Sequence, residues 1–573
     1  MHHHYPLTLP HSSLQTPSTP SFPTTSSGRR STMEPSRINV FDISLVLDEI
    51  TRYLTLKDLS RCVQVSQSLW SAFIPYLWRN IHFTSLTTQE RCNLIHPNSP
   101  FLLLSESTPV GRREYCRSAV RSVRLVAPLP AWPHNLASGP CFSNLIRFKL
   151  QNQIKGRGEE EIIAAVPRIL EFLAAHTTLR DIELSHLEIG SDFMDMFNIV
   201  MDQLPGLTRL VLFVRGKLTL RDHLLMLKQG QRLEEFHLSI DSSLYEYHEL
   251  DHTEIELYEQ GMREMKAKDS KIKDLCLNTE MFVRIMPDYL QRCVHLERLA
   301  IRTISVVQAT VDLADIVRDH CLRLRHLDIR NMHMSGTTQA SIIAACTPSA
   351  AQPHRPGLES LKLWLNITSM DVVLQSVLSH RTTLTSLSVS QRKGLTAIGL
   401  QQIVTNCANL KSLIVKLTFM DTLLIPMDDI KDITWSCRNL ITFALLTVDH
   451  CTATGRDPAI QYLEYLYTQL GTIPTLEVVS FRMGHAGWIP QRSLFLDGLE
   501  QLYNLKRMRI FGFHKEGASM LRRRHIESML ENWPRLEQLA GLLDHYRTFE
   551  LASWLMKARP DLELSAFSDG LNQ

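Results

Sequence analysis

Four cysteines share one spacing to the residues that follow them. Cys293, Cys321, Cys407 and Cys437 each lie three residues before a leucine. A cysteine thiolate can be a nucleophile or a zinc ligand, but structural zinc sites and redox pairs typically use CxxC, and none of the eleven cysteines forms one. The odd count also argues against a secreted disulfide framework. We therefore interpret these thiols as small buried side chains at a repeated turn. We expect a reducing compartment, cytoplasmic and/or nuclear.

Motifs that carry catalysis or bind cofactors are absent from the sequence. It has no GxSxG, P-loop, HExxH or EF-hand loop, and its 24 histidines are scattered. We predict no catalytic, cofactor-binding or metal-binding residues and no enzymatic activity. A hydrolase assembled from distant residues is the least favoured alternative. The net charge of +2, from 61 basic and 59 acidic residues, argues against a nucleic-acid partner. No run of about eighteen apolar residues indicates a membrane helix.

One short motif returns from residue 120 onward. It reads apolar, two variable residues, apolar, one variable residue, apolar. Fourteen steps separate the first and last copies, with a mean of about 30 residues. Fifteen copies begin at Val120, Leu145, Leu179, Leu207, Leu233, Ile272, Leu296, Leu324, Leu358, Leu384, Leu410, Leu440, Leu476, Leu505 and Leu536.

Between copies the apolar period changes from that of a strand to that of a helix. Leu400, Ile403, Val404 and Cys407, for example, lie on one helical side. Each unit is thus a short strand followed by a helix, and its apolar side is buried only when neighbouring units stack on it. The sequence predicts an α/β fold, an irregular solenoid of about 14–15 strand–helix repeats over residues 120–573. We expect surface loops at 241–271, 346–357 and 446–475.

The N-terminal part of the chain has a different organisation. Residues 1–37 are rich in Ser, Thr and Pro, and we predict a disordered tail there. Residues 38–83 predict three short helices, the second capped by a Thr55–Asp58 capping box. Residues 84–119 are expected to link this module to the repeats.

Two resemblances follow from these residues. The repeats resemble cysteine-containing leucine-rich repeats, which form a horseshoe-shaped solenoid. Residues 38–83 resemble an F-box, with matches at Tyr53-Leu54, Lys57-Asp58-Leu59, Val65-Ser66 and Leu77-Trp78-Arg79. The Leu-Pro that usually opens an F-box falls at Ile43-Ser44, and the usual Trp of its third helix falls at Leu69. The combination is typical of F-box/leucine-rich-repeat proteins.

The resemblance implies a substrate-recognition subunit of a cullin–RING (SCF-type) ubiquitin ligase. In that family the F-box binds a Skp-type adaptor and the repeats bind a target protein. We expect the adaptor-binding or module-core residues to be Ile43, Leu47, Ile50, Leu54, Leu59, Val63 and Trp78. The alternative is a non-ligase repeat scaffold or inhibitor that binds another protein. The missing Pro and shifted Trp favour this alternative, whereas the position of the helical module ahead of the repeats favours the ligase subunit.

The variable positions of the motif predict a target-binding surface. If the apolar positions point inward, the third, fifth and seventh positions point to the concave face of the sheet. Basic and aromatic residues gather there with a single acid, Asp328, among those from 298 to 364. Our hypothesis is that they bind an acidic or phosphorylated segment, and the alternative is an ordinary solvated sheet face. The predicted residues are Arg298, Arg302, Arg330, Lys362, Trp364, Arg507 and Arg509, with Phe511 beside the last two.

Overall fold

The computed structural model describes most of the repeat region and the helical module before it. The described residues are 44–83, 117–126, 142–152, 166–189, 193–216, 219–241, 252–264, 270–278, 282–303, 310–330, 334–349, 352–365, 370–391, 397–419, 433–449, 456–482, 498–513, 521–544 and 548–565. The predicted tail at 1–37 and nearly all of the predicted linker lie outside these ranges. The chain divides into two compact units, Met1–Ile74 and Pro75–Gln573.

Helices account for the described part of the first unit. They are α1 (Ser44–Tyr53), α2 (Leu56–Val65) and the first part of α3 (Gln67–Trp78). The predicted capping box is present: the Asp58 amide donates to Thr55 Oγ1 at 3.2 Å, and the Thr55 amide donates to Asp58 Oδ2 at 3.1 Å. These two bonds satisfy amide groups that the start of α2 would otherwise leave unpaired.

Parallel strands form the sheet of the second unit, and their order in space follows the sequence. Each strand pairs with the next, from β1–β2 to β16–β17. The strands are β1 (Asn80–Phe83), β2 (Ser122–Val126), β3 (Arg147–Gln151), β4 (Asp181–Glu188), β5 (Arg209–Arg215), β6 (Glu235–Asp241), β7 (Asp274–Asn278), β8 (Arg298–Thr303), β9 (His326–Ile329), β10 (Ser360–Leu365), β11 (Ser386–Gln391), β12 (Ser412–Phe419), β13 (Thr442–Asp449), β14 (Val478–Arg482), β15 (Ile510–Phe513), β16 (Gln538–Ala540) and β17 (Glu563–Ser565).

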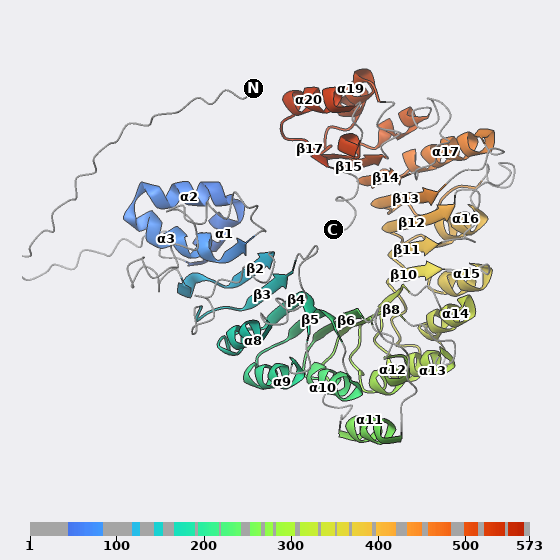
Figure 1. Ribbon diagram of the computed structural model, residues 1–573. Coiled ribbons are helices and arrows are strands. Elements are labelled where there is room, and N and C mark those ends of the chain that lie inside the picture. Colours follow the sequence, from blue (N-terminus) through green and yellow to red (C-terminus); the bar gives the residue numbers. More distant parts are fainter. Residues whose placement is uncertain are drawn as a thin grey trace, which may run out of the picture. The chain divides into compact units, whose positions relative to one another are not determined.

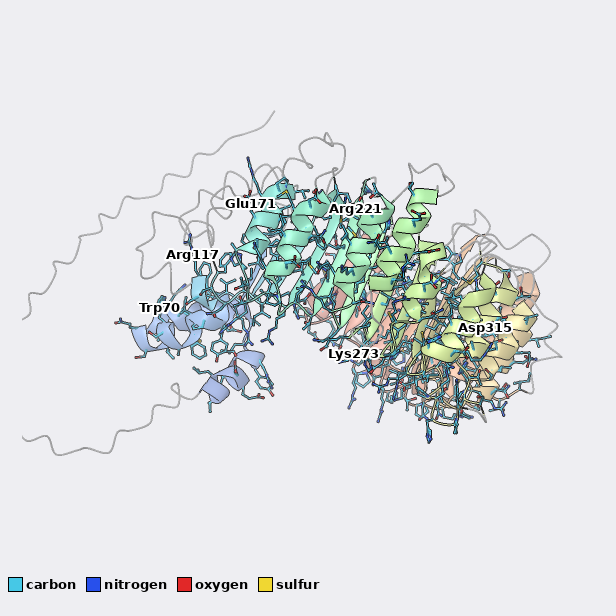
Figure 2. All side chains as sticks on the ribbon, turned by 90° about the horizontal axis from the view of Figure 1, so that it is seen from below. Trp70, Arg117, Glu171, Arg221, Lys273 and Asp315 are labelled. Atoms are coloured by element: carbon cyan, nitrogen blue, oxygen red, sulfur yellow. The ribbon has the colours of Figure 1, made fainter. Side chains whose placement is uncertain are left out.

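Helices cover one face of this sheet, and the other face is open (Figure 1). Figure 2 shows the helices of successive repeats side by side, with Glu171 on α8, Arg221 on α10 and Asp315 on α13. The α-helices are α8 (Val166–Ala174), α9 (Phe193–Gln203), α10 (Leu220–Gly230), α11 (His252–Glu264), α12 (Phe282–Leu290), α13 (Thr310–His320), α14 (Gly336–Ala345), α15 (Met370–Leu378), α16 (Ala397–Asn406), α17 (Arg456–Gly471), α19 (Arg523–Asn532) and α20 (Phe549–Ala558), with 3-10 helices η7 (Leu499–Asn504) and η8 (Leu542–Asp544). Among the described residues, no helix is both long and apolar enough to cross a membrane.

The predicted leucine-rich-repeat solenoid is confirmed. Each of the fifteen motif copies corresponds to one of the strands β2 to β16, although the copy at Leu505 is shifted by three residues, and β1 and β17 are two further strands. In the copy that begins at Leu384, for example, Leu384, Leu387 and Val389 are fully buried between sheet and helices. Because β1 pairs with β2, the sheet begins within the range predicted for the helical module.

Two of the three predicted surface loops contain regular structure instead. α11 occupies much of 241–271, and α17 occupies much of 446–475. Each is the helix of its own repeat: Met262 of α11 and Leu466 and Leu470 of α17 are buried. The long intervals between motif copies therefore contain ordinary repeat helices.

The third predicted loop, 346–357, carries a buried arginine. Arg355 donates to the carbonyl oxygens of Val317, Arg318 and Cys321 at 2.9, 3.0 and 3.2 Å. These carbonyls lie in the last turn of α13 and just after it, where a positive charge interacts favourably with the helix dipole. The segment is thus attached to the neighbouring repeat rather than being a free surface loop.

The four cysteines close the helix-to-strand turns, as predicted. All four are fully buried. The amide of the leucine three residues on donates to each cysteine carbonyl at 3.0 to 3.2 Å. Burial raises the pKa of the Cys293 and Cys437 thiols to about 12 and that of Cys407 to about 11. These thiols are therefore protonated at neutral pH, as a structural role requires.

Two histidines occupy the same turn in other repeats. His176 Nε2 accepts from the Phe142 amide at 3.2 Å, and His380 Nδ1 accepts from the Leu358 amide at 3.1 Å. The other ring nitrogen of each donates to a backbone carbonyl, that of Phe172 or Ile343. Burial lowers the pKa of both imidazoles, because it removes water from the charged form.

We expect Arg355→Ala to lower the free energy of unfolding by about 2–3 kcal/mol, because several carbonyls lose charged donors. Arg355→Lys should recover little of it, since one ammonium cannot reach all three oxygens. Urea denaturation followed by circular dichroism measures the effect. Arg323→Ala, at an exposed turn position of the adjacent repeat, is the control. Equal midpoints for the Arg355 and Arg323 variants would contradict this role.

Stability should fall as pH falls below about 6.5, the pKa at which an unfolded histidine takes up a proton. The folded imidazoles bind that proton only at lower pH, so each contributes up to about 1.4 kcal/mol of lost stability per pH unit in that window. In His176→Cys/His380→Cys, urea midpoints at pH 7.5 and 5.5 should differ less than in the wild type. The same pH dependence in both proteins would show that these histidines do not cause it.

Candidate functional site

A hollow of about 280 Å³ opens on the helix-free face of the sheet, over β6 to β10. Its polar lining comes from third, fifth and seventh motif positions, which the parallel register aligns across neighbouring strands. The lining residues are His237, Asp274, Cys276, Arg298, Leu299, Ala300, Arg302, His326, Leu327, Asp328, Ser360 and Lys362.

Short side chains leave the space for this hollow. Cys276 and Ala300 are paired fifth positions of β7 and β8, and Ser360 is the third position of β10. Longer charged side chains flank them. The Cys276 thiol is 4% exposed, and burial raises its pKa to about 11. It therefore contributes a neutral wall and not a reactive thiolate.

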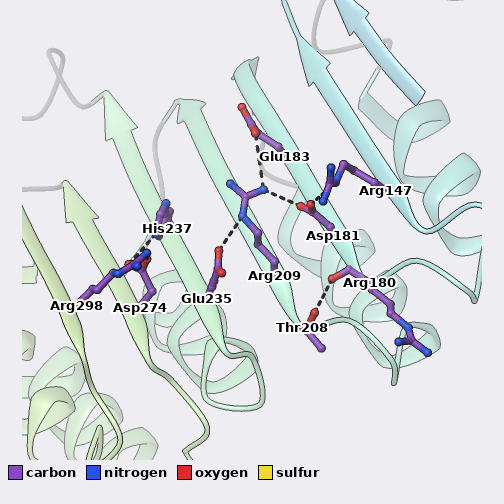
Figure 3. A network of polar contacts seen from close by, with 10 residues as sticks. All are labelled: Arg147, Arg180, Asp181, Glu183, Thr208, Arg209, Glu235, His237, Asp274 and Arg298. Carbon is purple, nitrogen blue, oxygen red and sulfur yellow. Dashed lines mark hydrogen bonds and ion pairs between the residues drawn. The ribbon is translucent and has the colours of Figure 1, made fainter. Parts of the chain in front are cut away.

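Alternating charges run along the third motif positions toward the hollow (Figure 3). Arg147 lies 2.6 Å from Asp181, and Arg209 bonds Asp181 at 2.7 Å and Glu235 at 2.9 Å. Arg209 also lies 3.8 Å from Glu183, which pairs with Lys149. Like charges directly opposite each other would be destabilising, and this order avoids them on β3 to β6.

The row of charges continues into the hollow at β6 to β8. His237 Nε2 lies 3.0 Å from Asp274, and Arg298 lies 3.6 Å from the same carboxylate (Figure 3). Burial alone would raise the pKa of Asp274, but the His237 hydrogen bond and the charge of Arg298 hold it below its ordinary value. Asp274 is therefore ionised at neutral pH. From 298 to 364 Asp328 is the only acid at the open-face positions, as predicted, but Asp274 of the preceding repeat adds a second acid to the hollow.

The predicted cations differ in how they are engaged. Arg330 forms two bonds to Asp328, at 2.8 and 2.7 Å, so it is held by the protein's own carboxylate. Arg302 lies 4.0 Å from Asp328, and its Nε has no hydrogen-bond partner among the described residues. Lys362 is exposed, and no described residue forms an ion pair with it.

Trp364 lies near the end of β10, two residues after Lys362, which lines the hollow. Its side chain is half-buried, rather than exposed as predicted. Its carbonyl accepts from Gln339 Nε2 at 3.1 Å, which ties this part of the strand to α14.

The predicted basic group at Arg507 and Arg509 does not lie on the open face. Ile510 pairs with Val478, a third motif position, so the repeat begins at Met508 and not at Leu505. Phe511, predicted to be on the face, is fully buried. Apolar residues at 505, 508, 510, 511 and 513 fit both registers, and the observed one buries both phenylalanines. Arg509 pairs with Glu477 and Glu537 just before the strands begin, and Arg507 lies in the preceding turn.

The predicted adaptor-binding residues divide between core and surface. Leu47, Leu59 and Trp78 are buried, and Ile50, Leu54 and Val63 are half-buried. Ile43 lies outside the described residues. Two large apolar side chains that were not predicted, Tyr53 and Val65, are 79% and 73% exposed. Helical spacing identifies the apolar side of a helix, but it does not show whether that side packs within the module or binds the adaptor.

Metal chemistry has no candidate in the part of the chain that the structure describes, where no group of three His, Cys, Asp or Glu residues could hold an ion.

Comparisons with known proteins give limited guidance. No protein-family model and no curated protein matches the chain. A leucine-rich-repeat protein of Leptospira interrogans is 11% identical over 76% of this chain and 93% of its own, with a TM-score of 0.32. The yeast complex of Rad7 and Elc1 gives 10% identity, 93% and 98% coverage and a TM-score of 0.27. At these TM-scores neither similarity supports a functional conclusion, and the repeat fold rests on the strands and helices themselves.

We expect Arg209→Ala to lower the free energy of unfolding by about 1–2 kcal/mol, because Glu235 loses its hydrogen-bonded cation and Asp181 loses one of two. The loss should shrink at high salt, which screens the remaining carboxylates. Urea denaturation at low and high salt measures both effects. Arg507→Ala removes the same charge outside the row and should change little. Equal losses in the two variants would contradict the role of the charge row.

Proposed function

We propose that this protein is the substrate-recognition subunit of a cullin–RING ubiquitin ligase. Its first unit binds a Skp-type adaptor and its repeats bind a target protein. The chain performs no chemistry itself: it holds the target near a conjugating enzyme elsewhere in the complex, and proximity raises the rate of transfer. With free buried cysteines, we place this activity in the cytoplasm or nucleus.

The observation that carries this proposal is the exposed apolar surface of the first unit. Tyr53 at the end of α1 and Val65 at the end of α2 are exposed, and Ile50, Leu54 and Val63 are half-buried. A partner that covers these side chains together would remove their apolar surface from water, which favours binding. The same segment carries the F-box resemblance, including the capped second helix.

The open face of the repeats supports the second half of the proposal. A stacked solenoid offers an extended surface, and on this one a hollow lies among charged side chains. Such a surface suits a segment of another protein. A repeat scaffold would use the same face, so adaptor binding decides between a ligase subunit and a scaffold.

Co-purification of the full chain with a Skp-type adaptor tests the proposal. We expect stoichiometric recovery for the wild type and loss of recovery for Ile50→Asp/Leu54→Asp. One buried charge at such an interface costs about 2 kcal/mol or more, roughly thirtyfold in affinity. Tyr53→Asp should also weaken binding. Variants of the buried Leu47, Leu59 or Trp78 are avoided because they would unfold the module.

Gln64→Asp is the matched control, since it adds the same charge at an exposed polar position of α2. Circular dichroism melting curves verify that each variant is folded. A folded wild-type chain that recovers no adaptor would contradict the ligase proposal and favour the scaffold. Equal recovery with Ile50→Asp/Leu54→Asp would show that the adaptor binds elsewhere.

A further inference from the structure

The hollow over β6 to β10 has unused donors but few unused acceptors. Arg302 Nε has no hydrogen-bond partner among the described residues, and the exposed Lys362 forms no ion pair with them. Arg298 approaches Asp274 only to 3.6 Å. All three cations line the hollow, Arg298 and Arg302 from β8 and Lys362 from β10.

The two carboxylates of the lining are already engaged. Both oxygens of Asp328 accept from Arg330, and Asp274 accepts from His237. A cationic ligand would have to displace these bonds, whereas an anionic ligand would add bonds to donors that lack them. The Arg302 side chain is 37% exposed and forms no hydrogen bond with the described residues, so an anion in the hollow would supply acceptors to its guanidinium.

Charge counting leads to the same conclusion. Arg298, Arg302 and Lys362 carry three positive charges, and Asp274 and Asp328 carry two negative charges. Counted over the Arg, Lys and Asp side chains that line it, the hollow carries a net charge of +1. Low-dielectric walls strengthen the resulting attraction for an anion.

The strands beside the hollow leave room for the chain that would carry this anion. On β11 to β13, five of the six third and fifth positions of the open face carry short side chains, and the six are Ser386, Ser388, Ser412, Ile414, Thr442 and Ala444. From β10 to β13 there are three strand spacings, about 14 Å, or roughly four residues of extended peptide. Short side chains let a peptide backbone approach the sheet there, and Trp364 offers an apolar contact at its edge.

We infer that this hollow binds a single anionic side chain of an extended target segment, that Arg302 and Lys362 bind it directly, and that Arg330 only positions Asp328. The segment then continues over β11 to β13. This inference rests on the proposed function in taking the target to be a protein. Arg302 and Lys362 thus contact the anion directly, whereas Arg330, which was predicted with them, does not.

Selection of displayed random twelve-residue peptides on the full chain tests the inference. We expect Asp or Glu to be enriched several-fold at one aligned position. The enrichment should persist on Arg507→Gln, which removes a cation outside the face, and disappear on Arg302→Gln/Lys362→Met. Because Lys362 is exposed, Lys362→Met alone stays folded and should weaken selected peptides about tenfold. Absence of acid enrichment, or equal enrichment on the double variant, would overturn the inference.

A synthetic selected peptide then identifies the anion. Replacing its enriched Glu by Gln should weaken binding about tenfold to the wild type and hardly at all to the double variant. Tighter binding of a phosphoserine version would assign the site to phosphorylated targets, and equal or weaker binding would assign it to carboxylates. Identical affinities of all three peptides would contradict an anion site.

Adaptor recovery is measured separately on the same preparations. Peptide selection that fails while the adaptor is recovered contradicts only the anion site. If the adaptor is not recovered but peptide selection succeeds, only the ligase proposal is contradicted.

Discussion

The burial of the three apolar motif positions between sheet and helices is the constraint on which the rest of the structure depends. One repeat cannot bury Leu384, Leu387 and Val389 alone, and these residues become inaccessible only when neighbouring repeats stack. Burying one such side chain is worth about 1.5–3 kcal/mol, so several per repeat outweigh any single charged contact. This burial fixes the strand register, because a shift by one residue would turn every apolar residue to the open face.

The open face follows from that register. Third positions meet third positions from strand to strand, so residues 24 to 39 positions apart in the chain become direct neighbours. On β3 to β7 these neighbours have mostly opposite charges and neutralise one another. On β8 to β10 the cations outnumber the acids, and short side chains open the hollow. The candidate site therefore differs locally from the neighbouring strands, where most charged side chains of the open face pair with one another.

Sequence reasoning located the repeats well, because apolar spacing records burial directly. It placed the strands of fifteen copies and the four cysteine turns, and it misplaced the register at residue 505, where apolar residues fit two alignments. It took the α11 and α17 segments for loops because they lie in the two longest intervals between motif copies. The partners of Arg298 and the bonds of Arg355 were beyond prediction from one sequence. Both arginines bond to residues of neighbouring repeats, and these residues are identified only when the register of the strands is known.

The account assigns two tasks to two units, adaptor binding to the first and target binding to the second. Hydrogen–deuterium exchange of the full chain with and without a purified Skp-type adaptor tests this division most directly. We expect added adaptor to slow exchange of amides within residues 44–74 and to leave those of β8 to β10 unchanged. Protection spread along the repeats, or no protection within residues 44–74, would contradict it.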